Sequence, residues 1–178
     1  ALLLAKGFSR MVIKQVSEAK GITIESRFKA TKTTFTELLT EEVNIPLTQA
    51  QQAVYEPIQE AMNSHEHKTF LLHGVTGSGK TQLYLRATAK CISQDKTAII
   101  LVPEIILTDQ IVRRFVETFG DEVVVFHSKL TVQQRNNNWE RLRRKDSHII
   151  IGARSAVFAP AENIGLIVVD EEHDTSYK

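Results

Sequence analysis

The stretch Gly74-Val75-Thr76-Gly77-Ser78-Gly79-Lys80-Thr81 decides the fold expected for this chain of 178 residues. It fits the pattern GxxxxGKS/T, in which a glycine-rich turn aims backbone N–H groups at phosphate oxygens. In that pattern the lysine, here Lys80, neutralises phosphate charge, and the hydroxyl, here Thr81, reaches Mg²⁺. The stretch therefore predicts a binding site for a nucleoside triphosphate with Mg²⁺.

The residues on both sides of this loop favour the same interpretation. Residues 68–73 (KTFLLH) are apolar enough for a short buried strand, and residues 81–93 suit a helix. Phosphate binding requires strand, loop and helix in this order, because the helix N-terminus points unpaired N–H groups and a positive dipole end at the anion. The alternative is a glycine-rich surface turn, in which the closing lysine and hydroxyl would be coincidental.

A second stretch, LIVVDEEH at 166–173, predicts the other half of such a site. An apolar run that ends in Asp-Glu is typical of a buried strand that delivers a metal-holding carboxylate, here Asp170. Glu171 would then orient the attacking water and accept its proton. We expect Lys80, Asp170 and Glu171 to be the catalytic residues, and Thr81 and Asp170 to share the metal ion.

From residue 48 onward the chain alternates between helical and strand patterns. A helix is expected from Thr48 to about Asn63 with an interruption at Pro57, and further helices at 81–93, 108–119 and 131–145. Beyond 68–73, short and continuously apolar strands are expected at 97–102, 122–126, 148–152 and 166–170. Strands of this kind are buried on both faces. The prediction is an α/β fold with a mostly parallel sheet covered by helices on both faces.

The first part of the chain is expected to form a separate module. Residues 1–32 fit two helices and a strand, which is typical of a partial winged helix, and residues 33–44 fit a linker with one helical turn. Such modules bind DNA in some proteins and only proteins in others, and the sequence leaves both open. Residues 45–178 would form the α/β lobe.

Charge, cysteine content and hydropathy limit the classes of protein. Residues 1–32 hold seven Lys/Arg against two acidic residues, and residues 113–145 hold eight against four, within a net charge of +1. Such zones suit a polyanion, although solvated faces also carry charge. Cys91 is the only cysteine, so an intramolecular disulfide is excluded and a reducing cytoplasm is the expected setting. No apolar run approaches the roughly 18 residues that cross a bilayer.

Polar and small residues follow each expected strand after the phosphate loop. Ligands of a parallel sheet bind outside the carboxyl ends of its strands. Hydroxyls, glycine amides and an arginine at successive strand ends fit a track for a sugar-phosphate backbone. The expected DNA-binding residues are Pro103, Glu104, Thr108, His127, Ser128, Arg154 and Ser155.

A glutamine ahead of the phosphate loop is a candidate adenine ligand. An amide offers a donor and an acceptor in one plane, which matches N7 and the N6 amino group of adenine. Gln51 is the first choice and Gln52 the second. On the residues alone, a surface glutamine on an amphipathic helix explains either position.

Several motifs together resemble the PriA family of bacterial replication-restart helicases. The resemblance covers roughly residues 47–178 and rests on GVTGSGKT at 74–81, LVPEI at 101–105, His127-Ser128, GARSA at 152–156 and VVDEEHDTSYK at 168–178. It implies a RecA-like P-loop NTPase lobe, the first lobe of a superfamily 2 helicase that moves 3′ to 5′. It implies action in restart of stalled forks and primosome assembly. It also favours Gln51 as the adenine ligand, while Glu172 and His173 are expected to couple the γ-phosphate to the DNA track.

The resemblance further implies cofactors and partners. ATP and Mg²⁺ would bind in this chain, whereas the family's zinc site lies in a part that this chain lacks. Expected partners are single-stranded and forked DNA, a second helicase lobe, a 3′-end-binding domain, primosome proteins and single-strand-binding protein. Because the second lobe supplies an arginine to the reaction, the chain alone should hydrolyse ATP poorly. The alternative is a regulatory nucleotide-binding module that does not translocate on DNA.

Overall fold

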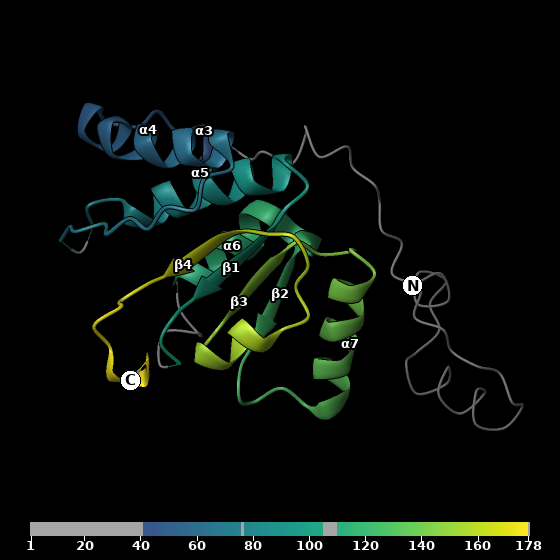
Figure 1. Ribbon diagram of the computed structural model, residues 1–178. Helices are drawn as coiled ribbons and strands as arrows, with labels where there is room; N and C mark the ends of the chain where they lie inside the picture. The colour runs from purple at the N-terminus through teal and green to yellow at the C-terminus, as the bar shows by residue number, and fades with distance from the viewer. Residues whose placement is uncertain (1–40, 76, 105–109, 178) are drawn as a thin grey trace, which may run out of the picture. The chain divides into compact units, whose positions relative to one another are not determined.

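The computed structural model describes residues 41–75, 77–104 and 110–177 (Figure 1). The expected module at 1–32, most of the linker at 33–44, Thr76 and Thr108 lie outside this part. The elements in chain order are α3 (Glu41–Asn44), α4 (Gln49–Ser64), α5 (Lys80–Ser93), β1 (Thr97–Leu101), α6 (Gln110–Phe119), η1 (Gly120–Glu122), β2 (Val123–Phe126), α7 (Val132–Arg143), β3 (Ile149–Gly152), η2 (Arg154–Phe158), β4 (Ile164–Val169) and η3 (Thr175–Tyr177).

Four parallel strands form one sheet in the order β2-β3-β1-β4. All residues of β1 and β3 are buried, as their continuous apolar sequences TAIIL and IIIG predict. Between successive strands of the chain, a helix or a longer segment crosses from one end of the sheet to the other, which a parallel sheet requires. The predicted α/β fold with a parallel sheet is confirmed.

Alternate residues of the strands pack on opposite faces of the sheet. Ile100 of β1 and Ile151 of β3 lie in one apolar cluster with Leu85 of α5 and Phe115 of α6. The other face has its own cluster, whose members from the strands, α7 and η2 include Ile99, Val124, Ile150, Leu142 and Ala156. Because side chains alternate along a strand, these two clusters bury both faces. Helices therefore cover both faces, as predicted.

Helix α4 runs through Pro57 without the expected interruption. Proline removes one backbone N–H and crowds the carbonyl of the residue four positions earlier, here Ala53. Both Pro57 and Ala53 are exposed, so water can satisfy that carbonyl. The opposite side of the helix buries Tyr55 and Ile58, and this packing keeps the helix intact.

The strand expected at 68–73 is not formed, so that prediction is wrong. The segment has no strand pairing, and Leu71 is 76% exposed. An apolar run indicates burial but does not specify a hydrogen-bonding neighbour. In the described part of the chain the sheet ends instead at β4, where Ile167 is 52% and Val169 43% exposed.

The other helices keep close to their expected ranges. Helix α5 begins at Lys80 and ends at Ser93, and α7 spans Val132–Arg143 against the expected 131–145. Helix α6 covers Gln110–Phe119, while the two residues expected before it lie outside the described part. Among the described residues, none of the helices combines the length and apolar character needed to cross a membrane.

A histidine and a glutamate join the amino-terminal ends of β2 and β3. His148 Nδ1 lies 2.7 Å from Glu122 Oε2, and both side chains are largely shielded, with 20% and 23% exposed. The hydrogen bond to Glu122 raises the pKa of His148, and burial opposes this effect less strongly. A raised pKa in the folded state means that protonation of His148 stabilises the fold.

We predict that Glu122→Gln lowers the free energy of unfolding by about 1 kcal/mol at about pH 5.5 and by less at about pH 8.5. The stabilisation by a raised histidine pKa is fully present below the ordinary value of about 6.5 and is lost as the pH rises through the folded value. Urea unfolding at both pH values measures the difference. Glu162→Gln, which removes only an exposed ion pair with Lys145, is the control. A loss of equal size at both pH values would contradict the prediction.

Candidate nucleotide-binding site

The glycines of the phosphate loop have the backbone conformation that the motif requires. Gly77 has φ +80° and Gly79 has φ +86°, a region that strains other residues. Gly79 immediately precedes α5, so the loop leads directly into the helix N-terminus. A Cβ atom on Gly79 would collide with Gln51 Nε2. The turn therefore aims the first N–H groups of α5 outward and excludes larger residues at this position.

Lys80 is held by carbonyl groups of the loop. Its Nζ donates to the carbonyl oxygen of Gly74 at 2.6 Å and to that of Val75 at 3.3 Å. It makes no ion pair with a carboxylate in the described part of the chain. The ammonium charge therefore adds to the positive end of the α5 dipole without being neutralised, and this combination favours a bound anion.

Gln51 lies against the phosphate loop. Its Nε2 donates to Ser78 O at 3.1 Å, and its Oε1 accepts from Thr48 N at 3.0 Å. Thr48 Oγ1 in turn accepts from Gln51 N, which completes a capping box at the start of α4. The other candidate, Gln52, donates to Glu56 on its own helix. Of the two glutamines, the structure brings Gln51 to the loop.

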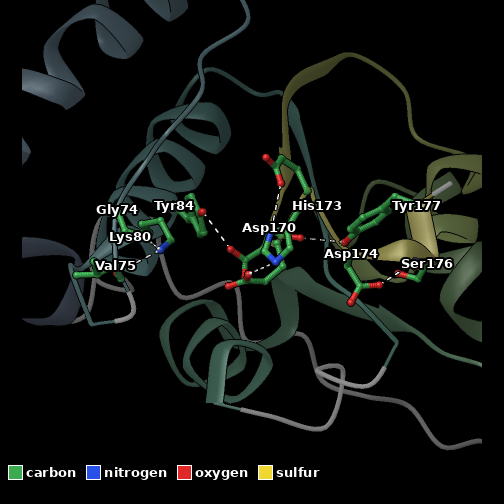
Figure 2. Close-up of polar contacts among 11 residues, drawn as sticks. Gly74, Val75, Lys80, Tyr84, Asp170, His173, Asp174, Ser176 and Tyr177 are labelled. Carbon is green, nitrogen blue, oxygen red and sulfur yellow. Dashed lines mark hydrogen bonds and ion pairs between the residues drawn. The ribbon is translucent and has the colours of Figure 1, made fainter.

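Asp170 lies close to the start of α5, although 86 residues separate it from Tyr84. The hydroxyl of Tyr84 donates to Asp170 Oδ1 at 3.1 Å, as Figure 2 shows. Lys80 and Thr81 precede Tyr84 by four and three residues and so share its face of the helix. The loop and the end of β4 therefore meet across this face. Burial and the Asp170 charge raise the pKa of Tyr84, so its proton stays available for the bond.

The residues after Asp170 form a tight turn. Glu171 has φ +49°, which is unusual for a residue other than glycine, and its carbonyl accepts from Asp174 N at 2.8 Å. The His173 ring lies between two carboxylates, 3.6 Å from Glu171 and 3.4 Å from Glu172. Tyr177 Oη donates to Asp170 O at 3.2 Å. These contacts connect the candidate catalytic and coupling residues in one structural unit.

The arrangement fits a magnesium ion that binds together with phosphates. Among the described residues there is no group of three or more His, Cys, Asp or Glu side chains arranged to hold a metal ion. Mg²⁺ is usually held by one or two carboxylates with substrate phosphates and water. Asp170 and the Thr81 hydroxyl offer the oxygen ligands that such an ion accepts.

The expected DNA-binding residues are only partly brought together. Glu104, His127, Ser128 and Ser155 line one cavity at the carboxyl ends of β2 and β3. The residues that do not join them are Arg154, which is exposed outside this lining, Pro103, which is fully buried, and Thr108, which lies outside the described part.

Sequence reasoning missed the two tyrosines that contact Asp170. Helical spacing could have indicated Tyr84, because it follows Lys80 by four residues on the expected helix. Tyr177 follows Asp170 by seven residues, across a turn and in the three-residue helix η3, which is too short for a periodic pattern in the sequence. Burial raises the pKa of Tyr177 to about 12, with further contributions from the charges of Asp170 and Asp174.

We predict that Tyr84→Phe lowers the free energy of unfolding by roughly 1 kcal/mol, because a buried hydroxyl loses its bond to a charged acceptor. Urea unfolding at pH 7 measures the loss. Tyr55→Phe is the matched control, since Tyr55 is also buried but its hydroxyl makes no hydrogen bond within the described residues. Equal stability losses in the two variants would show that the bond to Asp170 contributes nothing.

Comparisons with known proteins identify related chains. The DEAD/DEAH box helicase family matches residues 48–178. The replication restart protein PriA of Bacillus subtilis is 53% identical over 134 residues, which are 75% of this chain and 17% of the relative. The PriA proteins of Chlamydia pneumoniae and Synechocystis are 46% and 42% identical, over 72% and 74% of this chain and 17% and 16% of those relatives.

The match runs from the capping box of α4 to residue 178 and so contains both halves of the candidate site. The chain spans about one sixth of the length of these relatives. The similarity at more than 40% identity, together with the parallel sheet and the phosphate loop, leads to one conclusion. The chain belongs to the DEAD/DEAH box helicase family and is a homologue of the PriA replication restart proteins.

Proposed function

We propose that this chain is the ATP-binding motor lobe of a DNA helicase that moves 3′ to 5′ and acts in restart of stalled replication forks and primosome assembly. The observation that carries the proposal is the hydrogen bond from Tyr84 to Asp170, which joins the helix of the phosphate loop to the end of β4. The relatives carry the name replication restart protein. That name supports the proposed restart role. The direction of movement is proposed from the resemblance of the motifs to this helicase family.

In this proposal the phosphates of ATP bind at the start of α5. The N–H groups that follow Gly79 and the ammonium of Lys80 bind the phosphate oxygens. Thr81 and Asp170 hold Mg²⁺, which supplies charge neutralisation on the phosphates when it is bound. Glu171 orients the attacking water and accepts its proton.

Gln51 keeps enough hydrogen-bonding capacity to read adenine. Its amide has two N–H donors and two lone pairs on oxygen. One donor bonds to Ser78 O and one lone pair accepts from Thr48 N. The remaining donor and lone pair match N7 and the N6 amino group of adenine. Adenine selection by Gln51 therefore requires no contact to the loop to be broken.

Glu172 and His173 would couple the nucleotide to DNA. The His173 ring contacts the carboxylates of both Glu171 and Glu172. A change at the γ-phosphate that moves Glu171 would therefore move the ring as well. We propose that this movement is transmitted to single-stranded DNA along the strand ends, where Glu104, His127, Ser128, Arg154 and Ser155 are candidate contacts.

The remaining partners belong to a longer protein of this family. We propose that a second lobe, a 3′-end-binding domain and a zinc site lie there, and that forked DNA, primosome proteins and single-strand-binding protein are its partners in the cytoplasm. The support is similarity to relatives of which this chain spans 16% and 17%.

We predict that Lys80→Ala weakens nucleotide binding at least tenfold, because a charge-assisted hydrogen bond to phosphate is lost. The melting temperature should stay nearly unchanged, since the Lys80 ammonium contacts only two carbonyl groups. Titration with a fluorescent ATP analogue measures the affinity. Lys90→Ala, near the other end of α5, is the control and should bind like the original chain. An unaltered titration for Lys80→Ala would refute the proposed phosphate site.

We also predict that this chain alone hydrolyses ATP on the order of 10³- to 10⁵-fold more slowly than the full-length Bacillus subtilis relative with single-stranded DNA, the range expected for loss of an arginine supplied in trans. Phosphate release with and without DNA measures both rates. DNA-stimulated turnover in the full-length protein separates a motor from a regulatory nucleotide-binding module. Rates of the isolated chain close to those of the relative would contradict the two-lobe mechanism.

A further inference from the structure

A cavity of about 320 Å³ opens at the carboxyl ends of β2 and β3. In Figure 1, α7 lies alongside β2, and the short helix η2 follows β3 at the same end of the sheet. The cavity is lined from both helices and from the residues that follow β1 and β2. Its volume is at the lower end of the range for small-molecule sites and suits one flat heteroaromatic ring.

Two exposed aromatic side chains line this cavity. Phe158 of η2 is 79% exposed and Trp139 of α7 is 42% exposed, whereas Phe126 at the end of β2 is buried in the core. Scattered exposed apolar residues need no explanation, but two large aromatic rings on one cavity form a surface suited to stacking. Neither Phe158 nor Trp139 belongs to the buried cluster that contains Phe126.

Helix α7 is arranged to present these residues. It buries only Leu142, and Asn138 Nδ2 donates to Val125 O at 3.0 Å, which ties the helix to the edge of β2. Arg135 and Trp139 are four residues apart and so lie on the same face of the helix. Both line the cavity. Helix α7 therefore contributes one buried side chain to the core and two side chains to the lining of the cavity.

The charged side chains that line the cavity indicate which kind of ligand it could bind. The guanidinium of Arg135 makes no hydrogen bond or ion pair within the described part of the chain, so it is available to a phosphate. Glu104 lines the same cavity and is exposed. A carboxylate repels phosphate but accepts hydrogen bonds from ring and exocyclic N–H groups of nucleobases. Aromatic rings, one cation and one acceptor together suit a base with its phosphate outside.

We propose that this cavity binds a nucleobase of single-stranded DNA. Trp139 and Phe158 stack on the base, Glu104 accepts a hydrogen bond from its edge, and Arg135 binds the adjoining phosphate. The inference rests on the proposed DNA-motor function and adds base-stacking residues to a track otherwise expected to bind the sugar-phosphate backbone. Stacking tolerates every base, which suits a motor that acts on any sequence.

Trp139 is the only tryptophan of the chain and therefore reports directly on its own site. We expect an oligothymidine to quench its emission, whereas an abasic oligomer of the same length should bind more weakly and leave the emission unchanged. In Phe158→Leu, which keeps the reporter, the affinity for oligothymidine should fall roughly five- to tenfold, the lower end of what stacking on one base contributes, because leucine keeps part of the apolar contact. The affinity for the abasic oligomer should stay the same.

Val132→Ala is the matched control, because Val132 is 77% exposed on the same helix but does not line the cavity. Circular dichroism verifies that each variant folds. Equal affinity for both oligomers without a change in emission would overturn the stacking site, yet would leave DNA binding and the Lys80-dependent nucleotide titration intact. Failure of both oligomers to bind at low ionic strength would overturn the stacking site and the DNA part of the proposed function. If the chain bound both oligomers as expected but did not bind the ATP analogue, only the proposed ATP site would be contradicted.

Discussion

The hydrogen bond between Tyr84 and Asp170 joins the two halves of the candidate site. Nine residues of α5 are buried, so packing fixes the position of this helix against the sheet. Backbone pairing fixes the other partner, since Asp170 N donates to Leu101 O at 2.9 Å at the end of β1. The hydroxyl then sets the orientation of the carboxylate between these two rigid elements. The spatial relation of Lys80 to Asp170 is therefore a consequence of the core.

Both segments that would contact the nucleotide contain left-handed backbone, which also occurs in several turns elsewhere in the described part of the chain. Gly77 and Gly79 adopt left-handed conformations at little cost because they lack a Cβ atom. Glu171 adopts one at a cost of about 1 kcal/mol or more. The turn that holds Glu171 is closed by the bond from Asp174 N and supported by Tyr177 on Asp170 O. The strained backbone of Glu171, next to the candidate metal-binding carboxylate of Asp170, fits a residue proposed to position the attacking water.

The sequence predicted those elements that have a continuous apolar run or a motif of fixed spacing. Apolar runs identified β1 to β4, and the glycine-lysine pattern identified the start of α5. It failed at 68–73, because hydrophobicity reveals a tendency to be buried but not which neighbour supplies the hydrogen bonds. It also failed at Pro57, whose cost depends on exposure of the preceding turn. Helical spacing from Lys80 could have indicated Tyr84, whereas Trp139 gained its candidate role only from the way α7 packs, which no local pattern encodes.

Without a strand before it, the phosphate loop is held by the helices on either side. Gln51 of α4 donates to Ser78 O, and Lys80 of α5 donates to the carbonyls of Gly74 and Val75. Binding of a triphosphate would exchange the two carbonyl acceptors of Lys80 for phosphate oxygens. The ammonium is charged in both states, but phosphate oxygens carry negative charge and carbonyl oxygens do not, so Coulomb attraction favours this exchange. The contact from Gln51 does not compete with phosphate and can hold the loop in shape throughout.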